Sequence, residues 1–166
     1  MTLKPIILAA ALLFPVSVLA QTPAAPPADL KSFASAADIQ ALVAKAKAMP
    51  PAPLVLQPFF GTGAYRGNLE YRTGAAAPAS IHDTEAELMV VLDGAGTLTA
   101  GGTLVEGKRT NPTNQSGTSV TGGAPLHLAK GDITIVPAGV PHQIAPDSGA
   151  AMVLMTFHVP SPWPGK

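Results

Sequence analysis

The sequence contains no cysteine among its 166 residues. It can therefore form no disulfide bond, and it offers neither a thiolate nucleophile nor a zinc–thiolate site. Charged residues are also scarce, at 12% of the chain, and the formal net charge is zero. A surface that binds nucleic acid carries clustered lysine and arginine, so this composition argues against nucleic acid as a partner.

Long hydrophobic runs are missing as well. The apolar run Ile6–Val18 falls short of the ~20 residues that a membrane span needs, and Pro15 interrupts it. Lys4 precedes this run, and Val18–Ala20 provides small side chains at the positions that a signal peptidase reads. These features predict a secretory signal peptide over residues 1–20, and hence a periplasmic or secreted protein without membrane contact after cleavage. A membrane anchor is the alternative interpretation.

Residues 21–53 are expected to form a linker and one helix. Gln21–Ala28 is rich in proline and alanine, which favours an extended linker. Ser35 resembles a helix N-cap, and apolar residues then recur at helical spacing from Ile39 to Ala46. Pro50 and the prolines after it cannot continue a helix. We expect the apolar stripe of this helix to pack on the outside of the domain that follows, and a partner helix in a dimer is the alternative.

The remainder of the chain, residues 54–166, has the pattern of a β domain. Short apolar or alternating runs are separated by glycine, proline and asparagine, which is typical of an all-β sandwich or barrel. Asp93-Gly94 lies between two such runs and is a hairpin signal. Lys108–Thr118 is polar and rich in asparagine, serine, threonine and glycine, so we expect a mobile loop there.

The stretch Gly131–His142 contains a constrained turn that ends at a histidine. Glycine opens an apolar strand, and Pro137, Gly139 and Pro141 then force a turn before His142 begins the next strand. Proline fixes φ and glycine admits positive φ, so the geometry of this turn is tightly constrained. A stiff turn that delivers a histidine to a fixed place is what a metal site needs.

A second stretch, beginning at Ser80, carries a histidine and a carboxylate. Ser80 and His82 are two residues apart on an expected strand, so their side chains share one face. Glu87 begins the apolar run that follows, where a buried carboxylate is unfavourable unless it is paired or bound to a metal. The sequence therefore places His82 and Glu87 together as candidates for one polar site.

Both stretches resemble the sequence motifs of the cupin superfamily. The spacing G-x5-P-x-G-x2-H of the second cupin motif is matched at every fixed position from Gly131 to His142. In the first motif, His82 matches the second histidine, Glu87 the glutamate and Gly94 the glycine. Ser80 stands where that motif has its first histidine, so one ligand of the family is missing.

The resemblance implies a fold and a cofactor. The expected fold is all-β, the cupin double-stranded β-helix or jelly-roll barrel, with one N-terminal helix. His82, Glu87 and His142 would form a set of two histidines and one carboxylate, which suits a divalent ion of Fe, Mn, Ni, Co or Zn. The alternative is an empty cupin, in which these residues hydrogen-bond one another or water. Because many cupins are dimers, a homodimer is also expected.

Several further side chains are candidates for the pocket wall. Met89 shares the face of Glu87, and the parity of the last strand places His158 with its apolar inward residues, although a structural role for His158 is the alternative. Arg72 could grip an anionic substrate, whereas an exposed strand edge is the alternative for this segment. The expected pocket residues are Ser80, Met89, Tyr71, Arg72 and His158. His127 matches no metal position and is expected on the surface.

Two hypotheses about function follow from these residues. The first is a metal-dependent enzyme of isomerase, lyase or dioxygenase type that acts on a small polar metabolite. The second is a protein without catalysis that binds a small ligand outside the cytoplasm. The fold does not decide between them, because it serves many functions. Neither a Ser-His-Asp arrangement nor a phosphate-binding loop is visible in the sequence.

Overall fold

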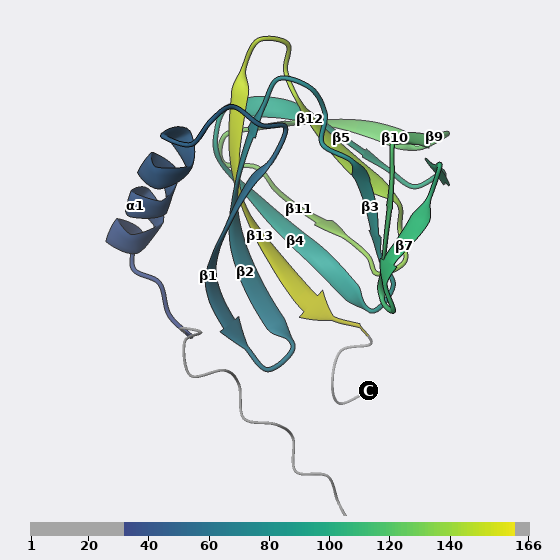
Figure 1. Ribbon diagram of the computed structural model, residues 1–166, viewed down its shortest axis with the longest axis horizontal. Helices are drawn as coiled ribbons and strands as arrows, with labels where there is room; N and C mark the ends of the chain where they lie inside the picture. The colour runs from purple at the N-terminus through teal and green to yellow at the C-terminus, as the bar shows by residue number, and fades with distance from the viewer. Residues whose placement is uncertain (1–31, 162–166) are drawn as a thin grey trace, which may run out of the picture.

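The computed structural model describes residues 32–161, and the predicted signal peptide and linker lie outside that range (Figure 1). Helix α1 spans Ala36–Lys47. The Ser35 hydroxyl accepts a hydrogen bond from the backbone N–H of Asp38 (3.1 Å), and the Asp38 carboxylate accepts one from the backbone N–H of Ser35 (3.0 Å). This reciprocal capping box satisfies two N–H groups at the helix start. The predicted helix start is therefore confirmed.

Two antiparallel sheets form the body of the domain, in agreement with the predicted fold class. In spatial order, the five-stranded sheet consists of β1 (Val55–Thr62), β2 (Tyr65–Thr73), β13 (Ala151–Pro160), β4 (Glu85–Asp93) and β11 (Ile133–Val136). The six-stranded sheet consists of β10 (Ala124–Ala129), β5 (Ala95–Ala100), β12 (His142–Pro146), β3 (Ala79–His82), β8 (Asn114–Gly117) and β7 (Lys108–Asn111). A two-stranded ladder of β6 (Thr103–Val105) and β9 (Ser119–Thr121) lies beside them.

The two sheets face each other as an open sandwich, so the expected jelly-roll barrel is present but is not closed. No ladder in the described chain joins an edge strand of one sheet to an edge strand of the other. The predicted Asp93-Gly94 hairpin is also wrong, because β4 and β5 on either side of this turn belong to different sheets. Gly94 has φ +78°, and a Cβ atom there would lie 2.0 Å from the carbonyl oxygen of Ala151. Only glycine fits this crossing between the sheets.

Apolar side chains fill two layers, one on each face of the five-stranded sheet. The inner layer lies between the sheets and holds Met89, Val91, Leu98, Leu128, Val136, Ile144, Met152 and Leu154. The outer layer joins the sheet to α1 and includes Ala46, Val55, Leu69 and Val153. Figure 1 shows α1 alongside β1 and β2, outside the sandwich, as the sequence predicted. Within residues 32–161, no helix has the length and apolar character needed to cross a membrane.

The expected mobile loop at Lys108–Thr118 is instead a hairpin. β7 and β8 pair with each other through a turn that contains Pro112, and β8 pairs with β3. The register sets His82 opposite Asn114. The polar composition reflects an exposed edge of the sheet and not an absence of regular structure. This hairpin places Asn114 beside His82.

Candidate metal centre

A polar pocket opens between the two sheets. Its volume is about 410 Å³, within the range of pockets that hold small molecules. Both sheets contribute to it, and its lining residues are Leu54, Leu56, Arg66, Asn68, Glu70, Arg72, Pro78, Ser80, His82, Glu87, His142, Gln143, Ile144 and His158. The predicted ligands His82, Glu87 and His142 are therefore brought to one place from positions far apart in the chain.

Glu87 and His158 enter the pocket from the five-stranded sheet. The register of β13 against β4 sets His158 directly opposite Glu87. Paired residues of neighbouring strands point to the same face, so both side chains face into the sandwich. Both are also buried, with 4% of Glu87 and 8% of His158 exposed. The parity argument that placed His158 with the inward residues of its strand is thus confirmed.

His82 and His142 enter from the six-stranded sheet, and each ring is held by its Nδ1 atom. The Nδ1–H of His82 donates to the Asn114 side-chain oxygen (2.6 Å), and that of His142 donates to the Val140 carbonyl (3.0 Å). Both partners can only accept, so each Nδ1 carries a hydrogen. The Nε2 atoms consequently face the Glu87 carboxylate, at 3.3 Å from His82 and 2.8 Å from His142. Such anchoring of the distal ring nitrogen is typical of metal-binding histidines.

These contacts need a positive charge between the rings and the carboxylate. With Nδ1 protonated, a neutral imidazole has a lone pair on Nε2, which would face the lone pairs of Glu87. Either a second proton on a ring or a shared cation resolves this conflict. Two ligand atoms that lie about 2.1 Å from one ion at a right angle are about 3.0 Å apart, close to the observed distances. The donor set therefore fits a divalent metal ion.

The electrostatics of the cluster favour an ionised Glu87 and a neutral His158, and they favour a proton on His82. Burial raises the pKa of Glu87, but hydrogen bonds from His142 and His82 lower it by more, so the carboxylate stays ionised. Burial lowers the pKa of His82, but its hydrogen bonds with Glu87 and Asn114 raise it by more. Burial is the main cause of the lowered pKa of His158, which favours a neutral ring with a free lone pair. The anionic Glu87 beside the neutral ring of His158 suits a metal, whereas a metal bound at His82 must displace the proton that the raised pKa of His82 favours.

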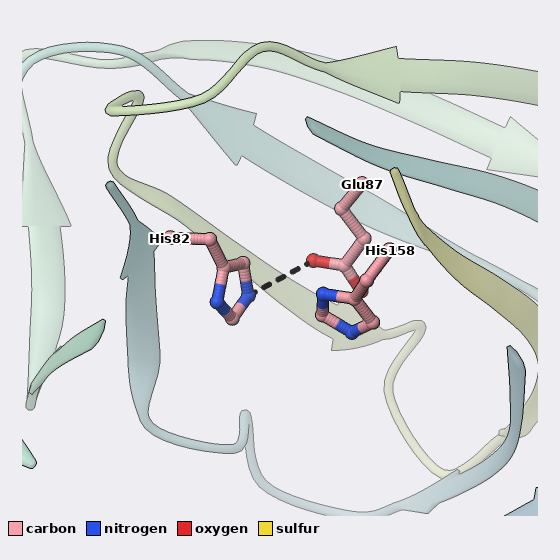
Figure 2. A group of neighbouring side chains, drawn as sticks. All are labelled: His82, Glu87 and His158. Atoms are coloured by element: carbon pink, nitrogen blue, oxygen red, sulfur yellow. Dashed lines mark ion pairs between the residues drawn. The ribbon is translucent and has the colours of Figure 1, made fainter. Parts of the chain in front are cut away.

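Figure 2 shows that His82, Glu87 and His158 converge on one point. One ring nitrogen of His82, one of His158 and a carboxylate oxygen of Glu87 all lie within 4.8 Å of one another. The His82 and His158 rings meet edge to face, with centroids 4.7 Å apart. Nδ1 of His158 is buried and has no hydrogen-bond partner among the described residues.

Ser80 lies in the wall of this pocket, as its position in the first motif indicates. Ser80 pairs with His142 across β3 and β12, and it lines the same pocket as His82, Glu87 and His142. The hydroxyl cannot replace an imidazole as a strong ligand. The cluster is therefore open on the side of Ser80.

The predicted pocket residue Arg72 lines the pocket but is already paired. Its Nε and Nη2 atoms lie 2.9 and 2.7 Å from one carboxylate oxygen of Glu70. The exposed-edge alternative for this segment is wrong, since Glu70 and Arg72 are both buried. Two other predictions need correction: Met89 lies in the apolar core beneath the pocket, and Tyr71 packs in the outer layer near α1. Tyr71 points outward because it alternates with Glu70 and Arg72.

Residues outside the motifs also shape the site. Asn114 was not among the predicted site residues, because no local pattern shows that β8 will lie beside β3. Glu85 begins β4, pairs with Arg66, and lies 3.4 Å from Nδ1 of His158. His127 is exposed, with Nε2 3.1 Å from Asp147, as expected of a surface residue.

Comparison with known proteins defines the fold. No family model and no curated protein matches the sequence. Among solved structures, the cupin domain of Cnp3 from Schizosaccharomyces pombe superposes with a TM-score of 0.51 at 14% identity, over 69% of this chain and 71% of that one. A protein with a double-stranded β-helix domain from Klebsiella pneumoniae gives 0.51 at 13% identity, over 70% and 82%. The DMSP lyase DddQ from Ruegeria pomeroyi gives 0.50 at 16% identity, over 80% and 66%. At these identities the similarity concerns architecture and not activity.

Proposed function

We propose that this chain, which has the double-stranded β-helix fold of the cupin superfamily, binds a divalent metal ion through His82, Glu87 and His142 and acts on a small polar metabolite. One observation carries the proposal: two histidines hold their Nδ1–H groups on fixed acceptors and turn Nε2 toward one buried carboxylate. The donor types suit Fe, Mn, Ni, Co and Zn alike. The reaction would be of isomerase, lyase or dioxygenase type.

The pocket suits a small, partly polar substrate. A bound ion would act as a Lewis acid on a substrate oxygen. Around it, Asn68, Gln143 and the paired charges of Glu70 and Arg72 form the polar wall, while Leu54 and Leu56 contribute an apolar side. Because Arg72 is occupied by Glu70, it serves the wall as part of a neutral pair and not as a free cation. A lyase in this fold, DddQ, supports an enzymatic role by analogy only.

Metal content of purified variants tests the metal centre. We expect His82→Ala, His142→Ala and Glu87→Gln each to lower bound metal strongly, since each removes a ligand. His127→Ala is the matched control, because His127 is an exposed histidine paired with Asp147. Its metal content should equal that of the unaltered protein. Equal losses in all four variants would show that the histidines act on folding or nonspecific binding, and the proposal would fail.

The nature of the metal then separates the two functional classes. A redox-active ion in the isolated protein favours the enzyme, whereas a metal-free protein that retains an organic ligand favours the binder without catalysis. Elemental analysis combined with native mass spectrometry of the isolated protein distinguishes these outcomes directly.

We further propose that the protein is exported and self-associates. The support for export is the segment that ends at Ala20, and protein from the periplasm should then begin at Gln21. An intact mass that retains Met1 in a membrane fraction would refute export.

The homodimer stays a prediction. Ile133 and Ile135 on edge strand β11 are 67% and 57% exposed and are apolar residues that such a contact would cover. Light scattering of the purified protein decides between monomer and dimer.

A further inference from the structure

His158, on the last strand, lines the same pocket as His82, Glu87 and His142. We propose that His158 on β13 is a metal ligand that takes over the role of the histidine missing at position 80. This inference rests on the proposed metal centre and extends it from three protein ligands to four. The cluster would then contain three imidazoles and one carboxylate, with His158 contributed by a strand that neither sequence motif includes.

The contacts of His158 are those of a ligand in position. It lies opposite Glu87 in the ladder of β13 and β4. Its ring packs edge to face against the ring of His82, with centroids 4.7 Å apart. One of its nitrogens lies within 4.8 Å of the ligand atoms of both His82 and Glu87. Figure 2 shows the three side chains directed at the same space. His158 thus reaches the cluster without any rearrangement of the sheets.

A purely structural role does not account for this histidine. A buried histidine that only stabilises a core has hydrogen-bond partners, as buried polar groups generally do. Nδ1 of His158 has none among the described residues. The nearest carboxylate oxygen belongs to Glu85, at 3.4 Å, and Glu85 is engaged with Arg66. A buried ring nitrogen without a hydrogen-bond partner, beside an anionic carboxylate and a second imidazole, is an atom placed to coordinate a cation.

Relocation of the ligand has a chemical consequence. Ser80 lies across from His142 on β3, whereas His158 lies across from Glu87 on β13. Three imidazoles and one carboxylate would therefore surround the ion, the same donors that the two complete motifs would supply. The pocket wall at Ser80 would carry no ligand side chain. A substrate oxygen or water can approach the ion there.

The test compares the metal affinity lost on His158→Gln with the affinity regained when Ser80→His is added. In chelator competition with Zn²⁺, we expect His158→Gln to weaken binding at least about 100-fold, since loss of outer partners of metal ligands alone weakens it 10–100-fold. Ser80→His should tighten binding in the unaltered background. The double variant Ser80→His/His158→Gln should recover most of the loss, because it restores three imidazoles around Glu87. His127→Gln is the control and should not change affinity.

The outcomes separate this inference from the proposed function. If His82→Ala and Glu87→Gln lose the metal while His158→Gln binds as tightly as the unaltered protein, His158 is not a ligand and the metal centre stands. If the unaltered protein binds no Zn²⁺, Co²⁺ or Mn²⁺, both proposals fail.

A second measurement needs no substitution, and so it is independent of any folding defect in the variants. The unaltered protein loaded with Cu²⁺ is examined by pulsed electron paramagnetic resonance, which counts coordinated imidazoles through their remote nitrogens. Three imidazoles are expected. Two coordinated imidazoles instead of three would overturn the role of His158.

Discussion

The buried ion pair between Glu70 and Arg72 yields a stability prediction with a definite size. Both residues lie on β2 and face the pocket, and only 10% of the Arg72 side chain and 5% of that of Glu70 are exposed. Replacement Arg72→Met leaves the Glu70 carboxylate buried, with the Thr156 hydroxyl at 3.3 Å as its remaining hydrogen bond. Breaking a buried pair in this way destabilises proteins by about 3–5 kcal/mol, because the remaining charge is uncompensated.

We expect about 3 kcal/mol for Arg72→Met, at the low end of that range because the pocket gives Glu70 some access to water. For a domain of this size the melting temperature should fall by about 10 °C. Urea unfolding followed by circular dichroism measures the free energy directly. Arg66→Met is the matched control, since Arg66 is an arginine of the same strand whose pair with Glu85 is half exposed. Its loss should be at most about 1 kcal/mol.

The double variant Glu70→Leu/Arg72→Met completes the experiment. Removing both charges together leaves no unpaired ion, so the total loss should be within about 1 kcal/mol of zero. The coupling energy between the two sites would then be at least about 2 kcal/mol. If Arg72→Met costs no more than Arg66→Met, or if the effects of the two substitutions simply add, the view of Glu70 and Arg72 as a buried, mutually dependent pair is refuted.

Three further predictions concern the metal centre and the chain crossing. Asn114→Ala removes the acceptor for the Nδ1–H of His82 and should weaken metal binding by about 10–100-fold in chelator competition, whereas unchanged affinity would mean that the ring needs no such support. Because the pKa of His82 is raised, protons compete with metal for its Nε2 as the pH falls. Below that pKa, metal affinity should drop by about tenfold per pH unit for each proton displaced. His82→Gln should make metal affinity less dependent on pH. Gly94→Ala should destabilise the fold by about 1–3 kcal/mol in urea unfolding, since it forces a side chain against the Ala151 carbonyl at positive φ, and a neutral effect would contradict the close crossing.

Local patterns in the sequence were sufficient for the class of fold and for much of its detail. The strand that carries Ser80 and His82 and the apolar strand after Gly131 were predicted, and the structure has them at Ala79–His82 and Ile133–Val136. The helix start at Ser35 was also predicted, because a cap depends on residues within one turn. Errors arose where a local signal has two outcomes. Asp93-Gly94 was correctly read as a turn, but the turn changes sheets instead of closing a hairpin.

The site divides in the same way. By itself, the sequence indicated that His82, Glu87 and His142 lie on or beside strands at the spacing of two motifs, since turn residues and strand alternation fix those side chains locally. Tertiary structure alone decided that His158 stands opposite Glu87, that Asn114 reaches His82, and that Arg72 is neutralised by Glu70 inside the pocket. These contacts depend on strand pairing, and the register between strands far apart in a chain is set by the packing of whole faces and not by neighbours in sequence.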